Sequence, residues 1–323
     1  MSGLGPIALV INPVATRAGA ARRAEITHAL APLGLEWALA TEGPGDAGRL
    51  ARRAADEGAR VVVTFGGDGT AAEAAGALAG GDVVMVPMPG GNANVFARAL
   101  GWPSSADRAL PVLVAALARG TVREAALGRV RVDEGEARTF TINAGVGLDA
   151  ATVEWIEARP RAKRRLRHAG FALGAAVSAL RSAREPRLSV TAGDGVVVEA
   201  AAVLAACGSP YTYLGPRPLD LVPGAAFDGR IGWVALTRIR PAEIGGLALR
   251  AARGRPLPLD GPALRGGATA EEIVVRADAP APVQADGEVL GRHTLVRIGP
   301  GPRLRALDPR GAPGLKSGPR PPT

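Results

Sequence analysis

Apolar and polar positions follow a regular alternation along the first 120 residues. Short apolar runs predict buried strands, and the longer segments between them are rich in the helix formers alanine, leucine and arginine. The expected strands are 7–11, 35–40, 61–65 and 83–87, and the expected helices are 20–33, 46–58, 71–78, 94–100 and 106–119. Strands that alternate with helices at these lengths predict an α/β N-terminal domain with a doubly wound parallel sheet.

The pattern changes after about Arg123, where short strand candidates follow one another with few helices between them. These candidates are 127–132, 137–143, 187–192, 196–206, 229–236, 272–277, 282–284, 293–298 and 302–306, with helical inserts at 149–182 and 241–253. This pattern predicts a β-rich, antiparallel, sandwich-like C-terminal domain. We expect domains over 1–124 and 125–307, with the last strands able to return to the first domain. Residues 308–323 are rich in proline and glycine and predict a disordered tail.

The length of 323 residues suits two domains, and the net charge of +9 favours anionic partners. Aromatic residues make up only 3% of the chain, so nucleic-acid bases would have little to stack on, and we expect no nucleic-acid partner. The single cysteine, Cys207, lies in an apolar run, which excludes a disulfide framework and predicts a buried, inert thiol.

No apolar run reaches the roughly 18 residues that a transmembrane helix needs. The first residues also lack a basic leader, so the sequence predicts a cytoplasmic protein without a transmembrane segment. A basic segment at 159–168 precedes the apolar residues 169–180. This arrangement is typical of a peripheral contact with a membrane surface, and a solvated helix face is the alternative.

The segment with the clearest chemistry follows the third expected strand directly. Gly66, Gly67, Asp68, Gly69 and Thr70 lie between that strand and a helix. A helix N-terminus and its backbone N–H groups favour a bound phosphate, and glycines let the phosphate approach the backbone. A carboxylate beside phosphates needs a cation or a donor, so Asp68 indicates a metal-nucleotide site. A glycine turn capped by Asp68 or Thr70 is the alternative.

Three further polar segments follow the other expected strands, namely Asn12, Thr41 and 90–94. Because ligands of doubly wound sheets bind at the carboxyl ends of the strands, we expect all four segments to lie at one edge.

The Gly-Gly-Asp-Gly-Thr segment resembles the signature shared by diacylglycerol, sphingosine, ceramide and NAD kinases. Residues 89–98 resemble the lipid-kinase loop Pro-x-Gly-Thr-x-Asn-Asp-Phe-Ala-Arg, with Asn92 in place of the threonine and Val95 in place of the aspartate. From about residue 7 to residue 306, the chain resembles the diacylglycerol kinase catalytic-domain family, in its bacterial soluble form.

The resemblance implies roles for particular residues. It implies that Asp286, in the segment Ala-Asp-Gly-Glu, is the general base, and that Asp68 joins it in catalysis. Asp228, with the carbonyl groups of Ala225 and Arg230, would hold a structural Mg²⁺. An Asp-Gly turn is the alternative at both Asp286 and Asp228. The implied nucleotide-binding residues are Asn12, Pro13, Val14, Ala15, Thr16, Thr41, Gly66, Gly67, Asp68, Gly69, Thr70, Glu73, Gly91, Asn92, Asn94 and Glu288.

The resulting hypothesis is a lipid kinase that uses ATP and Mg²⁺. It would convert diacylglycerol to phosphatidic acid in phospholipid biosynthesis, at an anionic membrane surface, and the resemblance also allows a homodimer. A sphingoid base or another long-chain alcohol is the alternative acceptor. An NAD kinase is disfavoured by the loop 94–98 and by the late Asp-Gly-Glu segment. A catalytically weak nucleotide-binding regulator stays open, because Asn92, Val95 and the turn 12–16 depart from the family pattern.

Overall fold

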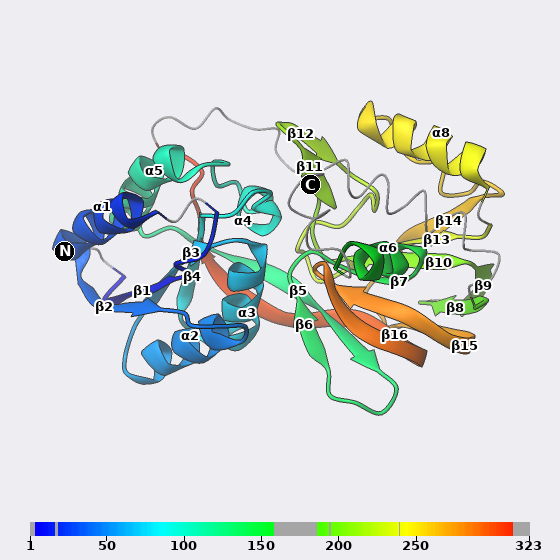
Figure 1. The fold of residues 1–323 in the computed structure, drawn as a ribbon, viewed down its shortest axis with the longest axis horizontal. Coiled ribbons are helices and arrows are strands. Elements are labelled where there is room, and N and C mark those ends of the chain that lie inside the picture. Colours follow the sequence, from blue (N-terminus) through cyan, green and yellow to red (C-terminus); the bar gives the residue numbers. More distant parts are fainter. Residues whose placement is uncertain (1–3, 17–18, 158–185, 194, 239, 313–323) are drawn as a thin grey trace. The chain divides into compact units, whose positions relative to one another are not determined.

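The computed structural model describes residues 4–16, 19–157, 186–193, 195–238 and 240–312 (Figure 1). The chain divides into two units, one with residues 1–126 and 302–323 and the other with residues 127–301. Strands β5 (Val122–Val132) and β16 (Glu288–Leu307) both run from one unit into the other. The chain therefore returns to its first unit at the end of β16, where Ala306 pairs in parallel with Met85.

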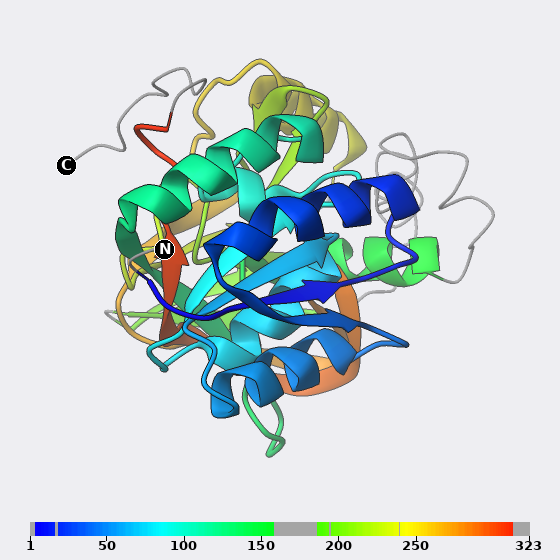
Figure 2. The same cartoon turned by 90° about the vertical axis from the view of Figure 1, so that its left-hand side faces the viewer.

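The first unit is a parallel sheet between two layers of helices. Its strands stand in the order β4-β3-β1-β2, and all neighbours are parallel. Helices α1 and α5 cover one face of this sheet, and α2 and α3 cover the other, as two perpendicular views show (Figures 1 and 2). The elements are β1 (Ile7–Ile11), α1 (Ala20–Leu30), a 3₁₀ turn (Ala31–Leu33), β2 (Leu35–Ala40), α2 (Asp46–Asp56), β3 (Val61–Gly66), α3 (Asp68–Leu78), β4 (Val84–Pro89), α4 (Val95–Ala99) and α5 (Ala106–Arg119). This arrangement confirms the predicted doubly wound α/β architecture.

Burial explains why the strands of this unit could be predicted. Every residue of β1, β3 and β4 is buried, as expected for parallel strands that helices cover on both faces. Small residues allow neighbouring helices to pack closely. A Cβ atom at Gly48 of α2 would lie 2.9 Å from the Glu73 carbonyl oxygen of α3, so only glycine allows these two helices to pack this closely.

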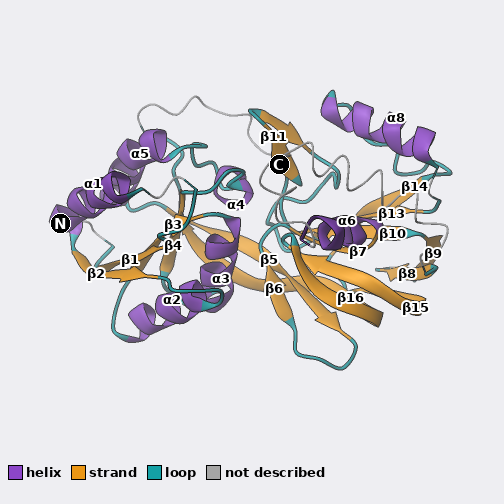
Figure 3. Cartoon of the chain, viewed as in Figure 1, coloured by secondary structure: helices purple, strands orange, loops and turns teal. Residues whose placement is uncertain are grey.

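The second unit is built mainly of antiparallel strands (Figure 3). Strands β14-β13-β10-β7-β15-β16 stand side by side in this order, while β8 pairs with β15 and β9 pairs with β8. The remaining elements are β6 (Arg138–Phe140), β7 (Asn143–Gly147), α6 (Leu148–Glu157), β8 (Leu188–Ala192), β9 (Val196–Ala200), β10 (Ala202–Ala206), β11 (Thr212–Leu214), β12 (Arg217–Leu219), β13 (Ile231–Leu236), α8 (Pro241–Ala252), β14 (Leu264–Thr269) and β15 (Ile273–Ala285). The expectation of a β-rich antiparallel region is confirmed.

Several local expectations in the second unit were wrong. The apolar run 196–206 is two strands, because the chain breaks at Ala201, whose N–H donates to the Leu236 carbonyl. The candidates 272–277 and 282–284 form the single strand β15, and 293–298 and 302–306 lie in β16. Strands β7, β11, β12 and β14 were not predicted.

The expectation of a disordered tail from residue 308 onward was wrong for its first residues. Asp308 and Pro309 are buried, and the Arg119 guanidinium donates to the carbonyl groups of Asp308, Pro309 and Arg310 at 3.2, 3.4 and 3.0 Å. These hydrogen bonds hold residues 308–310 in the first unit in spite of their Pro/Gly-rich surroundings.

The basic segment 159–168 lies outside the described residues. Within the part of the chain that is described, no helix is long and apolar enough to cross a bilayer. Cys207 is buried as predicted, and burial raises the pKa of its thiol well above the ordinary range.

Candidate functional site

The polar loops of the first unit gather at the carboxyl ends of its parallel strands. Asn12 follows β1, Thr41 follows β2, and Gly67 follows β3. Two contacts join neighbouring loops, because Asn12 Nδ2 donates to Thr70 Oγ1 at 3.1 Å and the Gly90 N–H donates to the Gly66 carbonyl at 2.7 Å. The loops after β1, β3 and β4 therefore form one connected cluster, as the sequence predicted.

Two of the glycines in this cluster are required by the fold. A Cβ atom at Gly66 would lie 2.5 Å from Thr70 Oγ1, and one at Gly91 would lie 2.6 Å from Gly67 Cα. Both distances are too short for a Cβ atom. Glycine at position 66 leaves room for the Thr70 side chain, and glycine at position 91 lets the loop after β4 approach the loop after β3.

Gly67 and Gly69 are different, because nothing in the fold requires glycine there. Gly67 has φ −88° and ψ −171°, which any residue adopts, and the nearest atom to a Cβ at that position is 3.7 Å away. Gly69 lies in the first turn of α3, and no atom comes within 4 Å of the Cβ position. The missing side chains leave the start of α3 open to a group that approaches from outside. Since the first N–H groups of a helix have no partner inside the helix, an anion is the group that suits this place.

Asp68 and Asn94 hold the two loops in shape. Asp68 Oδ1 accepts a hydrogen bond from the Phe96 N–H at 3.2 Å, in the first turn of α4. Asn94 is 2% exposed with φ +49°; its Oδ1 accepts from the Gly91 N–H at 2.9 Å, and its Nδ2 donates to the Gly91 carbonyl at 3.0 Å. Asn92 is exposed at the tip of this loop.

The turn after β1 is also open at its tip. Asn12 Oδ1 accepts a hydrogen bond from the Val14 N–H at 3.1 Å, and the Val14 side chain is 88% exposed. Pro13 and Ala15 lie on either side of Val14, and Thr16 follows them.

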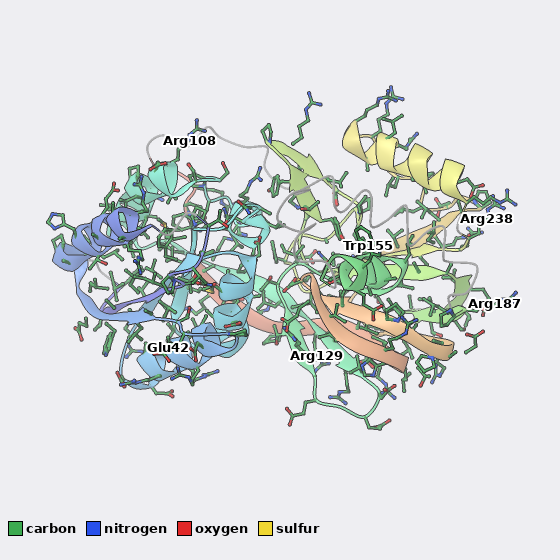
Figure 4. All side chains as sticks on the ribbon, viewed as in Figure 1. Glu42, Arg108, Arg129, Trp155, Arg187 and Arg238 are labelled. Carbon is green, nitrogen blue, oxygen red and sulfur yellow. The ribbon has the colours of Figure 1, made fainter. Side chains whose placement is uncertain are left out.

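Glu73 has a clear structural task. Its carboxylate accepts hydrogen bonds from the Gly45 and Ala47 N–H groups at 2.9 and 3.0 Å, at the start of α2. Glu42 lies in the same connection between β2 and α2 (Figure 4), and its N–H donates to Asp46 Oδ2 at 2.8 Å. The Glu73 carboxylate therefore caps the α2 N-terminus, and the Asp46 carboxylate holds the connection that precedes the helix.

Asp286 belongs to the second unit, in the turn between β15 and β16. Its φ of +49° is in the left-handed region. Its carboxylate accepts four hydrogen bonds, from Thr141 N at 2.6 Å, Thr141 Oγ1 at 2.9 Å, Ile142 N at 2.8 Å and Asn143 N at 3.1 Å. Burial raises the pKa of Asp286, although these donors act in the opposite direction. A carboxylate with a raised pKa can accept a proton more readily than an ordinary aspartate, and the same contacts also anchor the turn.

A set of hydrogen-bonded polar side chains beside Asp286 was not among the site residues expected from the sequence; it comprises the buried Gln284 and the half-buried Asp149 and Tyr211. Gln284 is 1% exposed, and its Nε2 donates to Asn143 Oδ1 at 2.9 Å and to Asp149 Oδ2 at 2.6 Å. The Tyr211 hydroxyl donates to Asp149 Oδ1 at 2.7 Å. Burial raises the pKa of Asp149 and raises that of Tyr211 well above its ordinary range. The sequence held one signal for this set, the polar Gln284 between the apolar residues Val283 and Ala285.

Two other predicted site residues of the second unit lie at its surface. Glu288 is exposed and pairs with Arg138. Asp228 is exposed in a turn, where its Oδ1 accepts a hydrogen bond from the Arg230 N–H at 2.9 Å, and Ala225 is buried nearby in the chain. No cluster of three or more His, Cys, Asp or Glu side chains that could hold a metal occurs among the described residues. An ion at Asp228 would therefore depend on main-chain carbonyl groups, which are suitable ligands for Mg²⁺.

Comparison with known proteins places this geometry in context. The family model described as the diacylglycerol kinase catalytic domain matches residues 6–130. The chain is 42% identical over 74 residues to a protein named "Probable lipid kinase YegS-like" from Cronobacter sakazakii, which covers 22% of this chain and 25% of the relative. It is 32% identical over 105 residues to "Diacylglycerol kinase" from Mycobacterium tuberculosis, which covers 32% of this chain and 33% of the relative. The chain thus matches only a quarter to a third of the length of these relatives.

Solved structures share the fold over nearly the whole chain. A diacylglycerol kinase structure from Bacillus anthracis str. Sterne matches with a TM-score of 0.69 and 19% identity, over 97% of this chain and 100% of that one. A second structure from the same organism matches with a TM-score of 0.69 and 20% identity, over 95% of this chain and 98% of that one. These structures show the fold, and the segment 6–130, which contains the glycine loops, is similar to the diacylglycerol kinase catalytic domain.

Proposed function

We propose that this protein is an ATP-dependent lipid kinase that transfers the γ-phosphoryl group of ATP to the hydroxyl group of diacylglycerol. The observation that carries the proposal is the open start of α3, where Gly67 and Gly69 lack side chains that the fold would accept. Glycine within a helix costs about 0.5–1 kcal/mol relative to alanine. The fold alone does not favour glycine at positions 67 and 69. A bound phosphate explains it, because a phosphate needs close access to the backbone.

In this proposal the first unit binds the nucleotide phosphates. The N–H groups at the start of α3 would donate to phosphate oxygens, and the exposed Asn92 amide can donate another hydrogen bond. Asn12, Thr70 and Asn94 keep the loops in position through their contacts with one another or with the backbone. Glu73 acts indirectly, because it holds the start of α2.

Asp286 would take the proton of the lipid hydroxyl. The hydroxyl oxygen forms a bond to the γ-phosphorus as the bond from that phosphorus to the ADP oxygen breaks, and the hydroxyl proton passes to the Asp286 carboxylate. The products are ADP and phosphatidic acid. The raised pKa of Asp286 suits this transfer, since the acceptor holds the proton more firmly than an ordinary aspartate does.

Magnesium enters the proposal in two places. Mg²⁺ that accompanies the ATP phosphates would supply positive charge to offset the charge that develops during phosphoryl transfer. A second, structural ion would be held by Asp228 with the carbonyl groups of Ala225 and Arg230, in the turn where Asp228 Oδ1 already accepts the Arg230 N–H.

Diacylglycerol is favoured as the acceptor by the names of the Mycobacterium tuberculosis relative and of the Bacillus anthracis structures. The test is a radiolabelled-ATP assay against diacylglycerol, sphingosine, a long-chain alcohol and NAD, each with Mg²⁺ and with EDTA. We expect label in phosphatidic acid only, and only with Mg²⁺. Label in sphingosine phosphate would change the acceptor, label in NADP would replace lipid by NAD, and no transfer to any acceptor would contradict a kinase function.

A further inference from the structure

We propose that Gln284 is a positioning residue for Asp286, and that Asp149 and Tyr211 hold Gln284 in its orientation. This inference rests on the proposed function, in which Asp286 is the general base. It concerns residues that do not touch the reacting atoms and act through the turn that carries Asp286.

Gln284 contacts both the turn that carries Asp286 and the neighbouring strand β7. Its Oε1 accepts a hydrogen bond from the Gly287 N–H at 2.8 Å, immediately after Asp286. Its Nε2 donates to the side chain of Asn143, whose own N–H donates to Asp286 Oδ1 and whose carbonyl accepts the Asp286 N–H at 2.8 Å. One buried amide therefore fixes both the turn and the strand from which Asp286 receives a hydrogen bond.

The oxygen and the NH₂ group of the Gln284 amide cannot exchange places. Because the Gly287 N–H requires an acceptor, the oxygen of Gln284 must face the turn, and the NH₂ group must face Asn143 and Asp149. Asp149 presents an acceptor to that NH₂ group at 2.6 Å, and a rotated amide would lose all three hydrogen bonds. Asp149 thus selects the one orientation of Gln284 that supports the turn.

Asp149 is in turn fixed by its surroundings. Its Oδ1 accepts the Tyr211 hydroxyl, and its Oδ2 lies where a Cβ atom at Gly145 of β7 would be only 2.3 Å away. Asp149 lies in the first turn of α6, the helix that also carries Trp155 (Figure 4). The absence of a side chain at Gly145 gives this carboxylate its place beside the sheet, between Tyr211 and Gln284.

A buried amide with a half-buried carboxylate and phenol is a costly way to support a turn, because each group loses contacts with water. A turn of this kind needs only a glycine and an aspartate, both of which are present. The additional network restricts where the Asp286 carboxylate can lie, and a base that is displaced by about 1 Å can lose about 100-fold in rate. Positioning of Asp286 is the use that accounts for the network.

The test compares Gln284→Met, which keeps the length of the side chain and removes its three hydrogen bonds, with Leu188→Ala as a matched control. Leu188 is a fully buried residue of β8 in the same unit, and its apolar side chain takes no part in the hydrogen bonds of the network, so this variant reports general destabilisation. For each variant we would measure kcat and KM for ATP with diacylglycerol, and NMR hydrogen exchange of the Thr141, Ile142, Asn143 and Gly287 amides.

We expect Gln284→Met to lower kcat by about 10- to 100-fold with KM for ATP unchanged, and to accelerate exchange at these four amides by about tenfold. Leu188→Ala should leave kcat unchanged at temperatures at which it is folded. Tyr211→Phe, which removes one oxygen atom, should act in the same direction with a smaller effect, and it decides the question if Gln284→Met does not fold.

Wild-type kcat in Gln284→Met, or an equal loss in Leu188→Ala, would overturn the inference. A lower kcat with unchanged exchange would also overturn it, because Gln284 would then act on the substrate directly. If the wild-type protein phosphorylates no lipid, the proposed function fails, and the exchange measurement still decides whether Gln284 holds the Asp286 turn.

Discussion

The two candidate sites of this protein are built on opposite principles. In the loops of the first unit the backbone itself is exposed, because Gly67 and Gly69 have no side chains to cover the start of α3. The Asp286 turn of the second unit does the reverse and surrounds one carboxylate with buried polar side chains. A phosphate can be bound by N–H groups that every residue carries, whereas a proton acceptor must be a particular side chain held in a particular place.

The difference extends to the energetic cost of each site. An open glycine loop costs conformational entropy and little desolvation. The half-buried carboxylates of Asp149 and Asp286 carry a desolvation penalty that raises the pKa of both. Substitutions in the two units should therefore change different quantities, nucleotide affinity in the first and turnover and pH dependence in the second.

The largest effect is expected from Asp286→Asn. Loss of a general base typically lowers a rate by about 10²–10⁴-fold, so kcat should fall at least about 100-fold. The affinity for ATP, measured by calorimetry, should not change, because the proposed phosphate site lies in the first unit. The amide meets four donors with only one oxygen, so we also expect a loss of about 1–3 kcal/mol in the free energy of unfolding.

Asp260→Asn, at an exposed position of the same unit, is the control for Asp286→Asn and should keep full activity. Wild-type turnover by Asp286→Asn would show that Asp286 is only a turn residue.

The next effect separates binding from stability in the first unit. Gly69→Ala and Gly245→Ala each add a methyl group to a helical glycine with no atom within 4 Å of the Cβ position. Each should increase the free energy of unfolding by about 0.4–1 kcal/mol in denaturant titrations. Only Gly69→Ala should weaken ATP binding, by about tenfold or more, since it obstructs hydrogen bonds to a charged phosphate. Equal ATP affinity in both variants would remove the main support for the phosphate site.

The pH dependence of stability should have opposite signs in the two units. The folded pKa values of Asp149 and Asp286 are raised above the ordinary value of 3.8, so the folded state binds more protons than the unfolded state between 3.8 and the folded pKa values. Their contribution to stability is therefore fully present below 3.8 and is lost as the pH rises through the folded pKa values.

Asp308 behaves in the opposite way. Burial opposes the shift, but the hydrogen bonds from Arg310 prevail and lower its pKa, so its contribution is present above 3.8 and is lost as the pH falls. Urea titrations from pH 3 to pH 7 measure the free energy of unfolding. Asp286→Asn should reduce the loss of this free energy as the pH rises, and Asp308→Asn should reduce its loss as the pH falls. The same slope in the wild type and in Asp286→Asn would contradict a raised pKa at this position.

The smallest effect distinguishes a helix cap from a nucleotide ligand. Glu73→Ala removes the acceptor of the Gly45 and Ala47 N–H groups and should cost about 0.5–2 kcal/mol of stability, with ATP affinity retained. Glu57→Ala, which removes an exposed pair with Arg53, should cost less stability than Glu73→Ala, because solvent screens an exposed ion pair. A large loss of ATP affinity in Glu73→Ala would instead favour the role that the family resemblance implied for Glu73.

Prediction from the sequence succeeded where the signal was local. In the first unit β1, β3 and β4 are mainly apolar runs of five or six residues, and helical segments separate the strands, so the hydrophobic pattern located them. The glycine loop was visible for the same reason, since Gly66 to Thr70 are consecutive. The edge strand β14, Leu264–Thr269, contains two glycines and was missed, because only its pairing with β13 makes it a strand.

The sequence by itself therefore determined the α/β architecture of the first unit, the position of its phosphate-loop candidate and the β-rich character of the second unit. Only the tertiary structure decided which strands pair in the second unit and what surrounds Asp286. The physical reason is separation along the chain. Gln284 bonds Asn143 and Asp149 across 141 and 135 residues, and Asp286 bonds Thr141 across 145. No local pattern records contacts of that range, whereas strand formation and the approach of backbone to an anion depend on neighbours within a few residues.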